Sequence, residues 1–327
     1  MKSFSNVNPR DLAHAVRLLS EAHTSGRKAA VAAGGSDLLG MIKEDLIAPD
    51  LLVNLKSVGG LDAIKSESAR VKIGGLISLD ALSSHSLIRS RYTALAEAAD
   101  VVASPQVRNT GTLAGNVCQR PWCWYFRAGF PCFKAGGQKC FSATGENQFH
   151  AIFGGGPSFI VHPSDTAPAL VALQAAFRIV GPAGERVVPA ADFFTLPARN
   201  AAVENLLQPA EILAEIHIPT VSRATRSTYV KIMDRETWTH AVVSVAMRLE
   251  LEGGICKSAS VVLGGVAPIP WRLPKVEQML AGQKIIPELA ARAGEESVAG
   301  ASPLAKNGYK VPLTKALVRR TLLSLAG

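Results

Sequence analysis

The sequence lacks long hydrophobic runs. Its longest candidate, residues 167–180, is interrupted by Pro168, Gln174 and Arg178. A transmembrane helix needs about 20 mainly apolar residues, so no membrane span is expected. The amino-terminal residues also lack the charged, apolar and small-residue order of a secretory signal, which favours a cytoplasmic location. Apolar residues still make up 48% of the 327 positions, enough to build a folded core.

Aromatic residues and charge runs are scarce as well. Aromatics make up 6% of the chain, and the 35 basic residues exceed the 26 acidic ones by 9 without forming a run of five. No helix-turn-helix, zinc-finger or RNA-recognition signature is present, so nucleic-acid binding is not expected. The surplus of positive charge suits an anionic partner such as a phosphate-bearing cofactor or an acidic subunit.

Helical and extended patterns alternate along the chain. Residues 9–23 have helical spacing that ends at Gly26, and residues 29–33 form a short apolar run. The alternation continues to a boundary near residue 220, which predicts a mixed α/β protein of about two domains. Residues 104–158 show no regular pattern, and irregular segments of this length are usually functional or disordered.

A glycine turn joins the strand at 29–33 to the next predicted helix. Adjacent glycines let a backbone approach an anion closely, and the N–H groups at a helix start can donate to phosphate oxygens. The pattern matches neither the Rossmann nor the Walker fingerprint. By itself it therefore does not distinguish a pyrophosphate site from an ordinary strand-to-helix turn. The candidate residues are Ala32, Ala33, Gly34, Gly35, Ser36, Asp37 and Leu38.

Three later features also suit a cofactor. The small residues of 109–116 offer a second close-approach surface or a tight turn, and the candidates there are Gly111, Thr112, Gly115 and Asn116. Asp165 either accepts a ribose hydroxyl or caps the helix that follows it. Lys231 either compensates the charge of a flavin or phosphate, or lies on a solvated strand edge.

Four of the five cysteines fall in the irregular segment, as Cys118, Cys123, Cys132 and Cys140. Their C-x4-C-x8-C-x7-C spacing suits a soft metal centre, either zinc or an iron–sulfur cluster. Structural zinc usually binds more closely spaced pairs, so the spacing favours iron and sulfur. No role is assigned to Cys256.

Taken in order, these segments resemble the FAD-binding medium subunit of the molybdenum hydroxylases, the family of xanthine dehydrogenase and carbon monoxide dehydrogenase. Further markers are residues 162–165, 211–213, 231–244 and 263–268. The insertion at 119–126 resembles the branch that contains the periplasmic aldehyde oxidoreductase medium subunit and the 4-hydroxybenzoyl-CoA reductase β subunit. That branch carries a [4Fe–4S] cluster beside the FAD.

The resemblance implies an α+β fold. Residues 1–220 would form a two-lobed FAD-binding domain of the PCMH type, similar to vanillyl-alcohol oxidase, with a cysteine-rich [4Fe–4S] loop at 118–158. Residues 221–327 would form a smaller α/β domain like the carboxyl-terminal domain of the carbon monoxide dehydrogenase flavoprotein.

The resemblance also implies roles for the candidate residues. Residues 33–38 would hold the FAD pyrophosphate, residues 111–116 would line a second FAD contact, and Asp165 would take a sugar hydroxyl. Leu213 and Lys231 would lie near the isoalloxazine ring, where a cation suits the negative charge of reduced flavin.

The cysteines depart from the branch at one position. Cys123, Cys132 and Cys140 match three of its cluster ligands, but the fourth commonly precedes the His-Pro-Ser-Asp motif, where this chain has Ser158. The fourth ligand would then be Cys118 or a serine oxygen, or one iron would have no protein ligand.

The function implied is electron transfer. A molybdopterin large subunit would oxidise an aldehyde, a purine-like heteroaromatic or an aromatic acyl-CoA, and a small [2Fe–2S] subunit would relay the electrons. The FAD of this chain would pass them to NAD, quinone, ferredoxin or oxygen, so no catalytic acid or base is expected here. A self-standing FAD oxidase and a zinc-stapled binding module remain alternatives. As an alternative to the cytoplasmic location, export together with a partner that has a twin-arginine signal would place the chain in the periplasm.

Overall fold

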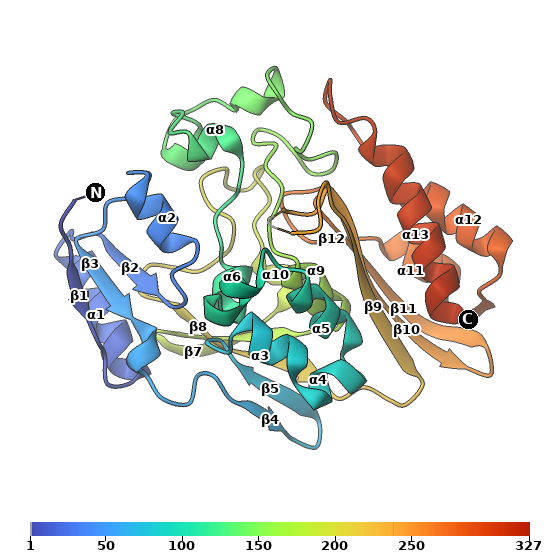
Figure 1. Cartoon of the computed structure of the whole chain (residues 1–327), viewed down its shortest axis with the longest axis horizontal. Coiled ribbons are helices and arrows are strands. Elements are labelled where there is room, and N and C mark those ends of the chain that lie inside the picture. The colour runs from blue at the N-terminus through green and yellow to red at the C-terminus, as the bar shows by residue number, and fades with distance from the viewer. Residues whose placement is uncertain (1, 238) are drawn as a thin grey trace.

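The computed structural model describes residues 2–237 and 239–327, and Trp238, within the 231–244 marker, lies outside them. The first lobe is a parallel sheet of order β1-β3-β2 with two helices beside it (Figure 1). Helix α1 begins after Asp11, whose Oδ1 accepts a hydrogen bond from His14 N at 2.7 Å. Its buried face packs against β3. The elements are β1 (Ser5–Val7), α1 (Leu12–Thr24), β2 (Ala29–Ala32), α2 (Leu38–Lys43) and β3 (Leu51–Asn54).

The second lobe is an antiparallel sheet of order β4-β5-β8-β6-β7, covered by short helices. Residues such as Ile73, Phe177 and Ile216 are fully buried between this sheet and its helices. The strands are β4 (Ile64–Ser66), β5 (Arg70–Gly74), β6 (Ala176–Gly181), β7 (Gly184–Pro189) and β8 (Ile212–Pro219). The helices are α3 (Leu79–Ser84), α4 (Ser86–Arg91), α5 (Thr93–Asp100), α6 (Pro105–Thr110), α7 (Leu113–Val117), α9 (Thr166–Ala172) and α10 (Ala190–Phe193).

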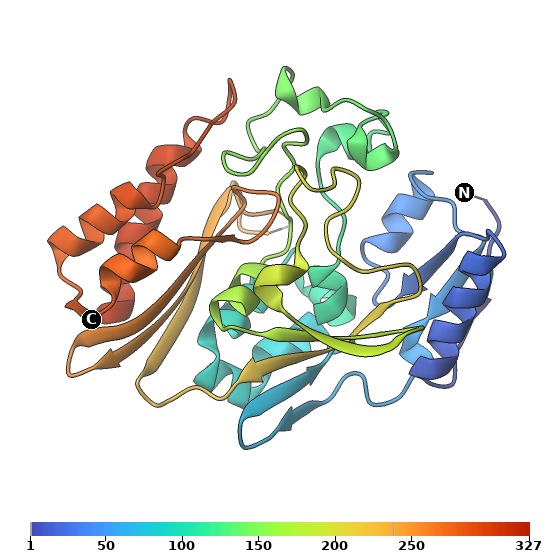
Figure 2. The same cartoon turned by 180° about the vertical axis from the view of Figure 1, so that it is seen from behind.

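The carboxyl-terminal part is a third, antiparallel sheet of order β12-β11-β10-β9, with β13 paired to β11. Helices α11, α12 and α13 cover one face, and α5 and α9 of the second lobe contact the same strands (Figure 2). The expected α+β architecture, with two lobes and a smaller α/β part, is confirmed. The elements are β9 (Thr225–Ile232), β10 (Val243–Glu252), β11 (Ile255–Gly264), β12 (Trp271–Arg272), α11 (Pro274–Leu280), β13 (Gln283–Lys284), α12 (Pro287–Glu296) and α13 (Lys310–Ala326). In the part of the chain that the structure describes, no helix is both long and apolar enough to cross a membrane.

The irregular segment contains more helix than its sequence predicts. It includes α6 and α7, and the short α8 (Trp124–Arg127) lies in the loop above the lobes (Figure 1). Pro105 stands at the first turn of α6, and Thr112 caps α7. These helices have four to six residues each, too few to display a helical period in the sequence.

Two ion pairs fasten this loop to the second lobe. The Glu204 carboxylate lies 2.8 Å from Arg120 Nε and 2.9 Å from Lys134 Nζ. The side chains of Glu204 and Lys134 are almost wholly buried. Buried pairs of this kind hold a fixed geometry, because separating them would leave a desolvated charge.

A buried lysine joins the loop to the carboxyl-terminal part. Lys310, at the start of α13, has no exposed surface, and its Nζ donates to Phe149 O at 2.9 Å and to Gly265 O at 2.7 Å. Burial lowers the pKa of Lys310 to about 7, with Asp234 opposing the shift. Lys310 thus connects two segments that are far apart in the sequence through a charge that burial disfavours.

We expect Lys310 to make stability depend on pH. Above pH 7 the unfolded chain keeps a proton that the folded chain loses, so the free energy of unfolding should rise with pH, by at most about 1.4 kcal/mol per unit. Denaturant unfolding of the natural chain and of Lys310→Met between about pH 7 and about pH 8.5 measures this contribution. The variant should lack this rise, and parallel profiles for the two proteins would contradict the prediction.

Candidate functional site

The glycine turn lies between the end of β2 and the start of α2. A Cβ on Gly34 would lie 2.0 Å from Thr110 O at the end of α6, so only glycine permits this contact. Gly35 has a φ of +77°, which favours glycine for a separate reason. Ser36 and Asp37 line a cavity of about 460 Å³, whereas the other predicted residues of the turn are not among its described wall residues. Those residues are Ala32, Ala33, Gly34, Gly35 and Leu38.

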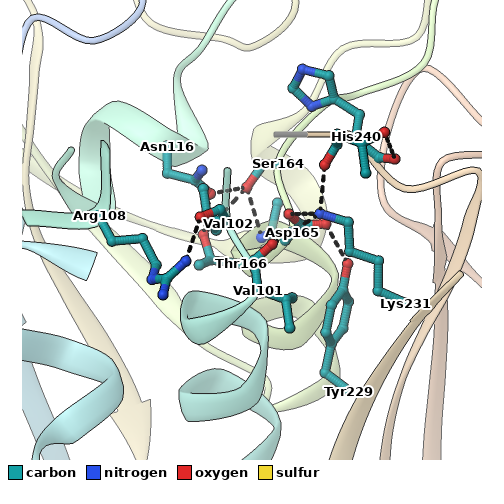
Figure 3. Close-up of polar contacts among 12 residues, drawn as sticks. Val101, Val102, Arg108, Asn116, Ser164, Asp165, Thr166, Tyr229, Lys231 and His240 are labelled. Atoms are coloured by element: carbon teal, nitrogen blue, oxygen red, sulfur yellow. Dashed lines mark hydrogen bonds and ion pairs between the residues drawn. The ribbon is translucent and has the colours of Figure 1, made fainter. Parts of the chain in front are cut away.

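The second small-residue segment lines the same cavity. Thr112 Oγ1 accepts a hydrogen bond from Gly115 N at 3.3 Å, which forms the first turn of α7. Asn116 Oδ1 accepts from Ser164 Oγ at 2.6 Å and from Thr166 Oγ1 at 2.7 Å, and these contacts fix its orientation (Figure 3). The four predicted residues on the cavity wall are Gly111, Thr112, Gly115 and Asn116.

Asp165 is buried beside this wall and also faces the cavity. Its Oδ2 lies 2.8 Å from Lys231 Nζ, and its Oδ1 accepts from the Tyr229 hydroxyl at 2.6 Å (Figure 3). Burial, together with the Asp165 charge, raises the pKa of Tyr229 well above its usual value. Asp165 makes no side-chain capping hydrogen bond to α9; instead, Ser164 Oγ accepts from Ala167 N at 3.0 Å.

Neither of the two residues predicted near the isoalloxazine ring lines this cavity. Lys231 also donates to Val101 O at 3.1 Å and Thr239 O at 2.9 Å, so it is a buried support for Asp165. Leu213 lies in β8, within the core of the second lobe.

Several cavity residues escaped the sequence analysis. They come from several distant segments, and two of them are Trp122 of the loop and His240, which follows β9. Their ring centroids lie 5.3 Å apart. The Arg127 guanidinium carbon lies 4.2 Å from the Trp122 ring, and Arg127 Nη2 lies 2.7 Å from Asp37 Oδ1. The aromatic residues of the insertion and the 237–244 stretch were the only signals in the sequence.

Three of the four candidate metal ligands share one environment. Cys132 is buried in a small cluster with Phe126, Cys123 packs against that cluster, and Cys140 Sγ accepts from Phe159 N at 3.5 Å. Burial raises the pKa of Cys123 to about 11, and the thiols of Cys140 and Cys132 add to the shift. Among the described residues, no group of three His, Cys, Asp or Glu is placed to hold a single metal ion.

Cys118 is not brought into this group. It ends α7 and packs against the core of the second lobe, because the apolar face of α7 is buried there. Burial alone raises the pKa of Cys118 to about 12. Ser158, by contrast, is buried and directly precedes Phe159, whose N–H contacts Cys140.

Two family profiles together match nearly the whole chain. One, described as the FAD binding domain in molybdopterin dehydrogenase, matches residues 2–221. The other, described as the CO dehydrogenase flavoprotein C-terminal domain, matches residues 228–325.

Curated relatives and solved structures agree with these matches. The chain is 33% identical to the aldehyde oxidoreductase FAD-binding subunit PaoB of Escherichia coli, over 90% of this chain and 89% of that protein. It is 27% identical to the carbon monoxide dehydrogenase medium chain of Hydrogenophaga pseudoflava, over 96% and 94%. A structure of the carbon monoxide dehydrogenase from that organism superposes with a TM-score of 0.77 at 26% identity, covering 99% of this chain and 97% of that one. The chain therefore belongs to the FAD-binding subunits of the molybdenum hydroxylase family and is an oxidoreductase subunit.

Proposed function

We propose that this chain passes electrons from a molybdopterin large subunit and a [2Fe–2S] small subunit, through FAD, to an external acceptor. The observation that carries the proposal is the cavity of about 460 Å³, which is walled by two small-residue segments and Asp165. Such a wall lets backbone N–H groups reach phosphate oxygens closely. The resemblance to PaoB over 90% of the chain favours an aldehyde as the substrate of the complex.

The chain's own groups suit FAD at several points. Ser36, Gly111 and Gly115 leave room for a pyrophosphate, and Asn116 keeps its amide nitrogen free of the contacts that fix its oxygen. Asp165 lines the cavity, and although Lys231 and Tyr229 each bond one of its carboxylate oxygens, a carboxylate can accept further hydrogen bonds, such as one from a sugar hydroxyl. Bound FAD would supply the exchange of one or two electrons, so the protein's task is binding and positioning.

The proposal extends to a [4Fe–4S] cluster held by Cys123, Cys132 and Cys140. Their shared environment and the Phe159 N–H on Cys140 support it, since N–H donors to cluster sulfurs are a usual feature of such sites. Cubane ligands stand farther apart than those of a single ion, which agrees with the absence of a single-ion site from the described residues. Ser158 is the proposed fourth neighbour, because it adjoins Phe159.

We expect the cluster to depend on these thiols and not on Cys118. Anaerobic reconstitution should give about four irons per chain and an EPR signal after reduction. Cys132→Ala should lose most of the iron, whereas Cys118→Ala, the matched control, should keep it. A chain that takes up no iron, or one that loses iron only in Cys118→Ala, would contradict the assignment.

The electron-transfer role requires the assembled complex. We expect an aldehyde, added without oxygen to the chain co-purified with its molybdopterin and [2Fe–2S] partners, to bleach the flavin absorption. The isolated FAD-loaded chain should not respond. Bleaching of the isolated chain would instead show a self-standing FAD oxidase.

A further inference from the structure

The cavity proposed for FAD has two carboxylates on its wall, those of Asp37 and Asp165. Among the wall residues that the structure describes, Arg235 is the only arginine or lysine. FAD carries an anionic pyrophosphate, and like charges repel one another more strongly inside a protein than in water. A carboxylate on this wall therefore weakens FAD binding unless a cation is paired with it. Asp165 has such a cation in Lys231, whose Nζ lies 2.8 Å from its Oδ2.

The cation paired with Asp37 comes from the loop at 118–158. Asp37 Oδ1 lies 2.7 Å from Arg127 Nη2, and Asp37 Oδ2 accepts a hydrogen bond from Arg120 N at 3.0 Å. The side chains of Arg127 and Asp37 are only 10% and 20% exposed. Asp37 directly precedes α2 but makes no side-chain capping hydrogen bond to it. Both carboxylate oxygens accept from the loop instead.

Arg127 is held in place from several sides. Its Nε donates to Pro121 O at 2.9 Å, and its Nη2 also donates to Arg120 O at 3.0 Å. Its guanidinium carbon lies 4.2 Å from the centre of the Trp122 ring. Arg127 is not among the described wall residues of the cavity, whereas Trp122 and Asp37 are. Arg127 therefore acts on the cavity through these two residues.

We propose that Arg127 is a positioning residue for FAD, which cancels the charge of Asp37 and so lets the pyrophosphate bind beside the glycine turn. Ser36, the neighbour of Asp37, lines the same cavity. This inference rests on the proposed function, to which it adds a residue of the loop. FAD binding then depends on the contact between the loop and the first lobe, because both partners of Asp37 belong to the loop.

Titration of apoprotein with FAD tests the proposal. Arg127→Gln should weaken FAD binding at least about tenfold, or 1.4 kcal/mol, because Asp37 then keeps its full charge. Arg127→Lys retains a cation and should lose less. Asp37→Asn combined with Arg127→Gln should recover most of the affinity, since the carboxylate is then gone. A variant that lost FAD through damage to the fold would not be rescued in this way.

Arg17→Gln is the matched control. Arg17 lies in α1 of the same lobe, its side chain is 54% exposed, and its loss should leave FAD affinity unchanged. Iron is measured in every variant, so that loss of the proposed cluster is recognised.

Three results would overturn the inference. They are natural affinity in Arg127→Gln, a double variant that recovers nothing, and a loss of FAD that occurs only together with a loss of iron. Failure of the natural chain to bind FAD would instead overturn the proposed function.

Discussion

Replacing Gly34 by alanine should cost the chain most of its FAD. The new Cβ would lie 2.0 Å from Thr110 O and 3.0 Å from Gly111 Cα, and both atoms belong to backbone that cannot turn aside. The glycine turn and the 109–116 segment would have to separate, which displaces two walls of the cavity of about 460 Å³ proposed for FAD. We expect FAD affinity to fall roughly a hundredfold, about 2.7 kcal/mol. Titration of apoprotein with FAD measures it.

Gly59→Ala is the matched control for this experiment. Gly59 lies between β3 and β4, its φ is not positive, and no atom of the described residues lies within 4 Å of its added Cβ. Its FAD affinity should equal that of the natural chain. Equal affinity in Gly34→Ala would show that the contact between the two segments does not shape the cofactor site.

Replacing Lys231 by methionine should destabilise the whole chain. The side chains of Lys231 and Asp165 are 1% and 5% exposed, and the change would leave the Asp165 carboxylate buried with only the Tyr229 hydroxyl as a partner. Removing one member of a buried pair costs about 3–5 kcal/mol. Denaturant unfolding should show this loss, and Asp165→Asn combined with Lys231→Met should recover part of it, because the charge is then gone.

Lys275→Met provides the comparison on the surface. Lys275 is 80% exposed and lies 3.8 Å from Glu296, so its loss should change the free energy of unfolding by no more than about 1 kcal/mol. Equal losses in Lys231→Met and Lys275→Met would mean that the Asp165 pair does not stabilise the junction between the second lobe and the carboxyl-terminal sheet.

Local patterns predicted most of the fold. The helical spacing of 9–23 corresponds to α1 and the apolar run of 29–33 to β2, because each period is carried by consecutive residues. Residues 79–91, by contrast, form two helices, α3 and α4, separated at His85, whose backbone is extended. Apolar residues continue through the break, so their spacing alone does not reveal it.

The site residues are likewise of two kinds, those that a local motif predicts and those that only the fold brings together. Small residues mark the walls locally, and the structure places Asn116 and Asp165 on the cavity as the motifs suggested. The partnership of Lys231 with Asp165 joins residues 66 positions apart, and the contact of Trp122 with His240 joins residues 118 positions apart. Such pairings depend on how the lobes dock on the third sheet, which no short motif records.

The FAD content of the purified chain tests the central claim most directly. The account predicts a yellow protein with one tightly bound FAD per chain, either as purified or after incubation of the apoprotein with FAD. A folded chain that stays colourless and binds no FAD in titration calorimetry would contradict it.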